Sequence, residues 1–257
     1  MSYIPHGKYP KTQKGFNVIS MMPGLFKNID FKDFVLTLGS DRANDCFSGI
    51  QFLYSSKYQE NDGSKLIMML SAIERSCGKW KSLDVLLRSK DFRRKIIMTK
   101  DGNEACTLLN DKIEEYLNNY GSNRLIVKFF RENLTNRSKM IFTGGIRRKF
   151  TYSKQRIANG TLLKPVYIQK SETIDEELGR VLKSFIYYIR NGFVHKASYI
   201  IIPNKKDIKI RKSYEFDVYI DGLPKEHWIS VIPFEVLNSL FCKAFVRYWR
   251  NEYLEKS

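Results

Sequence analysis

Several features common in membrane and metal-binding proteins are missing from this sequence. No stretch reaches the roughly 18 apolar residues that a membrane-spanning helix requires. The four cysteines (Cys46, Cys77, Cys106 and Cys242) lie far apart, and no Cys-x-x-Cys pair occurs. Each cysteine sits in an apolar segment, so we expect a small buried side chain at each position. Zinc sites are typically built from ligand pairs close in sequence, so we expect no metal. We also expect no cofactor and no membrane partner.

Two further absences concern nucleotides and secretion. Gly78-Lys79 lacks the upstream glycine and the following hydroxyl residue of a phosphate-binding loop. The segment Met1-Ser-Tyr-Ile-Pro-His-Gly-Lys8 has no apolar core of the kind a secretion signal contains. We therefore expect a cytoplasmic protein without a phosphate-binding loop of this type.

Positive charge is abundant. The chain has 257 residues, 44 Lys or Arg against 27 Asp or Glu, a formal charge of +17 and a sequence pI near 9.6. Such a balance favours a polyanionic partner, first nucleic acid and second an anionic membrane surface. The length suffices for one large domain or two small ones.

Residues 135–170 contain no Asp or Glu, and Phe150, Tyr152 and Tyr167 are interleaved with their basic residues. Basic and aromatic side chains together suit RNA, because charges bind the backbone and rings stack on unpaired bases. Gly144-Gly145 and Asn159-Gly160 predict hairpin turns. A solvated insertion is the alternative. The residues predicted to contact RNA are Arg137, Lys139, Arg147, Arg148, Lys149, Lys154 and Arg156.

Apolar periodicity predicts a mainly α protein: a helical bundle with a small inserted antiparallel β element and a basic hairpin or loop. Prolines and glycines predict an irregular N-terminal arm over residues 1–40, laid on a helical domain at 41–257. Within the arm, Phe31–Leu38 fits either a short helix or a strand. The helical domain carries the basic insertion at 135–170 and the β insertion at 199–222. Residues 96–98 read as extended, and His227 as part of a loop. Helices are predicted at 41–57, 64–77, 103–120, 124–134 and 234–254, and strands at 199–203 and 208–220.

The clearest helix begins at Thr173, which forms a capping-box pattern with Glu176. Near its end lie Arg190, Asn191 and His195, a residue set suited to phosphodiester cleavage. Histidine moves protons near neutral pH, arginine binds phosphate through paired hydrogen bonds, and asparagine orients either group. The neighbouring 2′-hydroxyl of RNA would supply the nucleophile without a metal.

The segment Arg190-Asn-Gly-Phe-Val-His195 resembles the Arg-polar-x-x-x-His signature of the HEPN superfamily (higher eukaryotes and prokaryotes nucleotide-binding domains). The apolar run from Leu66 to Arg75, which includes Glu74, is similar to the second helix of such domains. The resemblance implies a helical bundle, a homodimer, and metal-independent endoribonuclease activity in defence or toxin systems. It also implies Glu74 as a support for the cluster, and an antitoxin or regulatory protein as a further partner.

Other interpretations of the same residues stay open. Arg190 and His195 also fit a solvated helix end, since cations favour the C-terminal dipole, and Glu74 also fits an exposed pair with Arg75. The chain would then be a non-catalytic RNA-binding module with the same fold, or a structural or adaptor protein.

Overall fold

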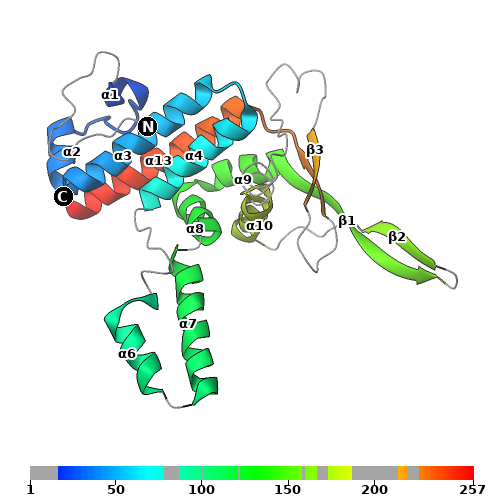
Figure 1. Cartoon of the computed structure of the whole chain (residues 1–257). Coiled ribbons are helices and arrows are strands. Elements are labelled where there is room, and N and C mark those ends of the chain that lie inside the picture. The colour runs from blue at the N-terminus through cyan, green and yellow to red at the C-terminus, as the bar shows by residue number, and fades with distance from the viewer. Residues whose placement is uncertain are drawn as a thin grey trace.

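The computed structural model describes residues 17–77, 87–99, 101–120, 122–157, 160–166, 173–186, 214–218 and 226–257. Within these ranges the chain is mainly α-helical, with one small antiparallel sheet, as the sequence predicted. Figure 1 shows the helices gathered into a bundle from which two hairpins extend, one helical and one of strands.

The centre of the bundle consists of α3 (Ser40–Ser55), α4 (Asp62–Cys77), α8 (Ser122–Asn133) and α13 (Phe234–Lys256). The first two are joined by a short connection containing the 3₁₀ helix η1 (Ser56–Tyr58), and they lie beside α13 (Figure 1). Asn61 accepts a hydrogen bond from the Ser64 amide at 3.2 Å, so the predicted turn with a helix cap is confirmed. Helix prediction was accurate here because each helix buries one apolar face.

Residues 17–38 do not form the irregular arm that the sequence predicted. They contain α1 (Val18–Met21) and α2 (Phe31–Leu38), whose first turns are capped by the side chains of Asn17 and Asp30. Leu25 and Phe34 are fully buried in the core. The glycines and prolines misled the prediction because they lie between short helices, where Pro23-Gly24 allows a turn.

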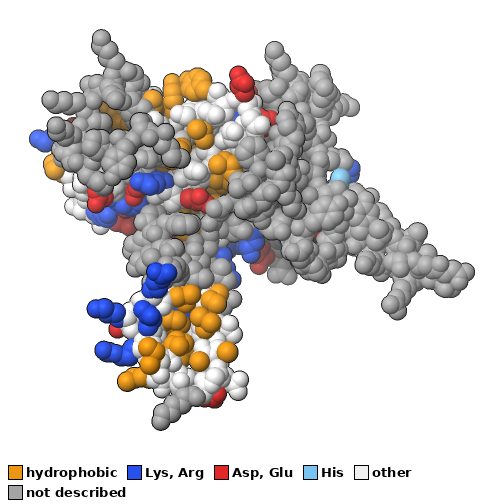
Figure 2. All heavy atoms as spheres, viewed as in Figure 1, with side chains coloured by type: hydrophobic (Ala, Val, Ile, Leu, Met, Phe, Trp, Pro, Cys, Tyr) orange, Lys and Arg blue, Asp and Glu red, His pale blue; other side chains and the backbone are white. Residues whose placement is uncertain are grey.

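A helical hairpin of α6 (Lys90–Met98) and α7 (Gly102–Tyr120) extends from the bundle (Figure 1). Residues 96–98 are therefore helical, not extended. None of the residues of α6 is buried, and Ile97 is 80% exposed. Figure 2 shows apolar side chains gathered over this hairpin, with Lys and Arg beside them. Since Lys and Arg are good helix formers, local propensity supports α6 without burial.

The basic segment has two parts. Its first part is α9 (Asn136–Gly145), which buries Phe142 in the core, so residues 136–145 belong to the bundle and not to an insertion. Gly144-Gly145 ends this helix and makes no hairpin turn. A Cβ on Gly145 would lie 2.8 Å from Ile232 Cβ, so glycine is needed there for close packing. The second part is the predicted hairpin, β1 (Ile146–Ile157) with β2 (Gly160–Val166).

The sheet has four antiparallel strands in the order β2-β1-β4-β3. Its remaining strands are β3 (Tyr214–Val218), inside the predicted strand at 208–220, and β4 (Glu226–Ser230). His227 thus lies in a strand and not in a loop, pairing with Phe150 and Asp217. The predicted strand at 199–203 lies outside the described residues.

Candidate functional site

The predicted catalytic residues Arg190, Asn191 and His195 lie outside the described residues. The helix that precedes them in the sequence is described as α10 (Ile174–Ile186). Its predicted capping box is confirmed. The Glu176 amide donates to Thr173 Oγ1 at 3.2 Å, and the Thr173 amide donates to Glu176 Oε2 at 3.2 Å. These reciprocal bonds fix where the helix begins.

Helix α10 is held against α8, α9 and β1. Leu178, Val181 and Leu182 are fully buried on its inner face. At its first turn, Lys139 Nζ of α9 lies 2.6 Å from Asp175 Oδ1, and Arg131 Nε of α8 donates to the Asp175 carbonyl at 3.0 Å. The start of the helix is therefore fixed by a cap, a packed face and two cations.

In the described part of the chain, Lys139 and Arg148, both predicted to contact RNA, form ion pairs. The Lys139 side chain is only 7% exposed and pairs with Asp175, so it binds α10 and does not offer its charge at the surface. Arg148 Nη1 lies 2.6 Å from Glu226 Oε1, and Glu226 Oε2 accepts a hydrogen bond from Trp228 Nε1 at 3.0 Å. Both cations stabilise the fold through pairs that sequence spacing does not reveal.

The other five residues predicted to contact RNA lie on two elements, α9 and β1. Arg137, on α9, and Arg147 and Lys149, on β1, are exposed. Lys154 and Arg156 pair through the backbone with Leu163 and Thr161 of β2, and their side chains lie outside what the structure describes. Among the predicted RNA contacts, the described side chains that are exposed are therefore those of Arg137, Arg147 and Lys149.

A β-bulge interrupts β1 between Arg148 and Phe150. Before it, Arg148 pairs with the buried Trp228, on the inner side of the sheet; after it, Phe150 pairs with His227. An extra residue reverses the two-residue alternation of a strand. Before the bulge, odd-numbered positions such as Arg147 share one face of the strand. After the bulge, the even-numbered positions lie on that face. Lys154 and Arg156 therefore hold register positions on the same face as Arg147.

Glu74, proposed as a support for the catalytic cluster, is half-buried near the end of α4. Burial raises the pKa of the neighbouring Cys77 thiol to about 12, and the Glu74 carboxylate adds to that rise against the opposing charge of Arg42. Burial also raises the pKa of Cys46 and Cys242. These three thiols are therefore protonated near neutral pH and poor nucleophiles. Cys106 is exposed, so the prediction of a buried cysteine is wrong at this position, because α7 extends from the bundle (Figure 1).

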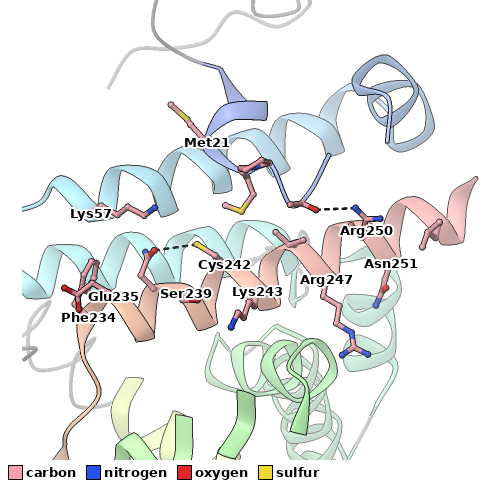
Figure 3. A pocket seen from close by; sticks show the side chains of 16 residues that line it. Met21, Lys57, Phe234, Glu235, Ser239, Cys242, Lys243, Arg247, Arg250 and Asn251 are labelled. Atoms are coloured by element: carbon pink, nitrogen blue, oxygen red, sulfur yellow. Dashed lines mark hydrogen bonds between the residues drawn. The ribbon is translucent and has the colours of Figure 1, made fainter. Parts of the chain in front are cut away.

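A groove that the sequence did not predict runs along α13. Figure 3 shows its lining side chains, which come from α13, from the end of α1 and the turn after it, and from Lys57 of η1. Its volume is about 1010 Å³, and its lining is mainly apolar. Lys243 and Arg247 are exposed along its edge. The one signal in the sequence was their four-residue spacing beside the buried face of α13.

Among the described residues, no three His, Cys, Asp or Glu side chains form a group able to hold a metal ion.

No helix in the described ranges combines the length and the apolar character needed to span a bilayer.

Comparisons with known proteins do not assign the chain to a family. No protein-family model matches the sequence, and neither the curated proteins nor the solved structures contain a significant match.

Proposed function

We propose that the protein is a metal-independent endoribonuclease, acting in a defence or toxin-type system. The observation that carries the proposal is the motif of Arg190, Asn191 and His195, which follows the capped helix α10 in the sequence. The described part of that helix packs against β1, the strand that carries the exposed Arg147. Positive charge suited to an RNA backbone therefore lies on a strand in contact with α10, the helix that precedes the motif in the sequence.

In the proposed mechanism His195 assists proton transfer between the 2′-hydroxyl and the leaving 5′-oxygen. The 2′-oxygen attacks the adjacent phosphorus, and the bond from phosphorus to the 5′-oxygen breaks. Arg190 binds the phosphate and stabilises its developing charge, while Asn191 orients the imidazole or the hydroxyl. The products are a 2′,3′-cyclic phosphate and a 5′-hydroxyl. In a homodimer, the partner implied by the resemblance, two copies of the motif would share one groove.

The test is incubation of end-labelled RNA with the full chain in excess chelator, with analysis of the product ends. We expect cleavage that His195→Ala and Arg190→Ala abolish. His227→Ala is the matched control, since it removes a histidine of β4 and should leave cleavage unchanged. Cleavage that needs a divalent ion, or that survives His195→Ala, would contradict the mechanism.

A dimeric site allows a second test. Mixed dimers of the Arg190→Ala and His195→Ala chains contain one intact copy of each residue. If the two motifs act in one groove, mixing should restore part of the cleavage that each variant lacks. Activity that remains absent after demonstrated subunit exchange would indicate that each motif acts alone.

A non-catalytic RNA-binding module is the second candidate, favoured by the exposed Arg137, Arg147 and Lys149. It predicts RNA binding without cleavage and an affinity that falls steeply with salt. Filter binding beside the cleavage gel separates the two functions, because unchanged affinity in His195→Ala with no cleavage by either protein would favour the module.

A further inference from the structure

The residues that line the groove along α13 belong neither to the motif of Arg190, Asn191 and His195 nor to the basic hairpin. Its lining runs from Phe234 to Leu254 on one helix, about 30 Å at 1.5 Å per residue. A small ligand would occupy only part of such a length, whereas a partner helix of several turns would follow all of it. The shape therefore favours an elongated occupant.

The lining combines an apolar floor with a cationic edge. Met21, Met22, Cys242 and Val246 contribute flexible or small apolar surface, which accommodates the side chains of a docked helix. Met22 is buried, while Cys242 and Val246 are half-buried. Figure 3 shows Met21 on α1 and Cys242 on α13. A partner that buries this apolar floor would gain stability for the complex from the hydrophobic effect.

The charges are arranged along that floor. Lys243 and Arg247 are exposed one helical turn apart, and Lys57 lies on the opposite side of the groove (Figure 3). Within the described residues, no carboxylate lies in ion-pair distance of these three cations, and the only acidic residue in the lining is Glu235. Arg250 differs, because its Nη1 donates to the carbonyls of Gly24, Leu25 and Lys27 and so closes the groove wall.

We propose that this groove docks an acidic amphipathic helix of a partner protein. The apolar face of that helix would contact the floor, and its Asp and Glu side chains would reach Lys57, Lys243 and Arg247. RNA fits less well, because the floor is made of Met, Cys and Val and offers few rings on which bases stack. A flat bilayer fits less well than a helix, because the apolar floor is recessed between α13 and the turn after α1 (Figure 3). The inference does not depend on nuclease activity.

The probe is a fluorescent synthetic helix of about 20 residues, with Glu on one face and Leu on the other, titrated with the full chain and followed by anisotropy. The double variant Lys243→Glu/Arg247→Glu should weaken binding by about tenfold or more. Arg93→Glu/Arg94→Glu is the matched control: it changes the net charge equally, but at exposed positions of α6. It should leave affinity within about twofold of the wild type.

A second readout locates the bound helix. Cys242 lines the groove and Cys106 is exposed on α7. Because burial raises the pKa of Cys242, alkylation is carried out at alkaline pH over a long time course, and mass spectrometry then reports on both positions in one chain. Bound peptide should slow modification of Cys242 and leave that of Cys106 unchanged. Val246→Asp should weaken binding, whereas Leu36→Asp, at a 63% exposed position of α2, should not.

Several results would overturn the proposal. Absence of peptide binding would do so, as would equal weakening by the two charge-reversal variants, or equal affinity for a peptide with Lys in place of Glu. Single-stranded RNA or phosphatidylglycerol vesicles that protect Cys242, where the acidic peptide does not, would assign the groove to that other ligand. Circular dichroism of each variant shows whether its helices remain formed.

Discussion

Arg42 on α3 forms a two-pronged ion pair with Glu252 in the last turns of α13. Its Nε lies 2.8 Å from Glu252 Oε1 and its Nη2 lies 2.6 Å from Oε2. The same Nη2 donates to the Ser76 carbonyl of α4 and to the Tyr248 hydroxyl, and the guanidinium carbon lies 4.5 Å from the centre of the Trp249 ring. One side chain thus connects three helices of the bundle.

Replacing Arg42 with Met should destabilise the protein by about 3 kcal/mol, because Glu252 would lose its partner in a site where the two side chains are only 20% and 15% exposed. Arg75→Met is the control. Arg75 pairs with Asp45, but its side chain is 56% exposed, so its loss should cost less than about 1 kcal/mol. Urea unfolding measures both, and equal losses would show that the Arg42 pair is no stronger than a surface pair.

The same pair predicts a dependence of stability on pH. Burial disfavours the charged Glu252 carboxylate, but the hydrogen bond and charge of Arg42 outweigh burial, and the net effect lowers its pKa. A carboxyl group with a lowered pKa in the folded state contributes stability that is complete above its unfolded pKa, about 4.3. That contribution is lost as the pH falls through the lower, folded pKa.

Unfolding free energies measured from pH 6 to pH 3 should therefore converge for the wild type and Glu252→Gln. The variant should be the less stable protein at pH 6, and the gap should narrow below about pH 4.3. A gap that stays constant over this range would mean that the charge of Glu252 does not contribute to stability.

Gly49 sets the approach of α3 to α13. A Cβ at this position would lie 2.5 Å from Phe245 Cε2, and Phe245 is fully buried, so Gly49→Ala forces a ring to move in a packed core. We expect a loss of about 1–3 kcal/mol. In contrast, nothing lies within 4 Å of a Cβ at Gly102, near the start of α7, and Gly102→Ala should be neutral or slightly stabilising. Thermal unfolding distinguishes them, and equal midpoints would contradict this packing.

Lys139 and Arg147 provide a test of the basic segment. Lys139→Ala should lower stability by about 1–2 kcal/mol, because it removes a buried stem and the ion pair with Asp175, while leaving RNA affinity nearly unchanged. Arg147→Ala should do the reverse, since Arg147 is exposed. If Arg147 contacts a phosphate, the slope of log affinity against log salt should fall by about 1. Weaker RNA binding in Lys139→Ala at unchanged stability would contradict this prediction and show that Lys139 contacts RNA.

Local patterns in the sequence were sufficient for much of the fold. The helices near 41–57, 64–77 and 234–254 were predictable because their apolar residues recur at helical spacing and each buries one face. The capping box of Thr173 and Glu176 was predictable because both partners lie within one turn. The hairpin at Asn159-Gly160 was predictable for the same local reason.

Contacts between distant parts of the chain were not predictable in this way. The pairing of Lys139 with Asp175, and that of Arg148 with Glu226 across 78 positions, removed two cations from the predicted RNA surface. Gly145 looked like a turn residue but is required by the approach of Ile232. In each case the partner that decides the role lies far away in sequence.

The sequence by itself determined that this is a strongly basic, mainly helical chain. It also predicts that Arg190, Asn191 and His195 lie near the end of an amphipathic helix. Those properties depend on composition and on spacing within a few turns. Only the tertiary structure decided which cations remain exposed, how β1 joins β4, and that a groove with a cationic edge follows α13. The physical reason is that burial and ion pairing depend on which surfaces meet, and that is fixed by the packing of the whole bundle.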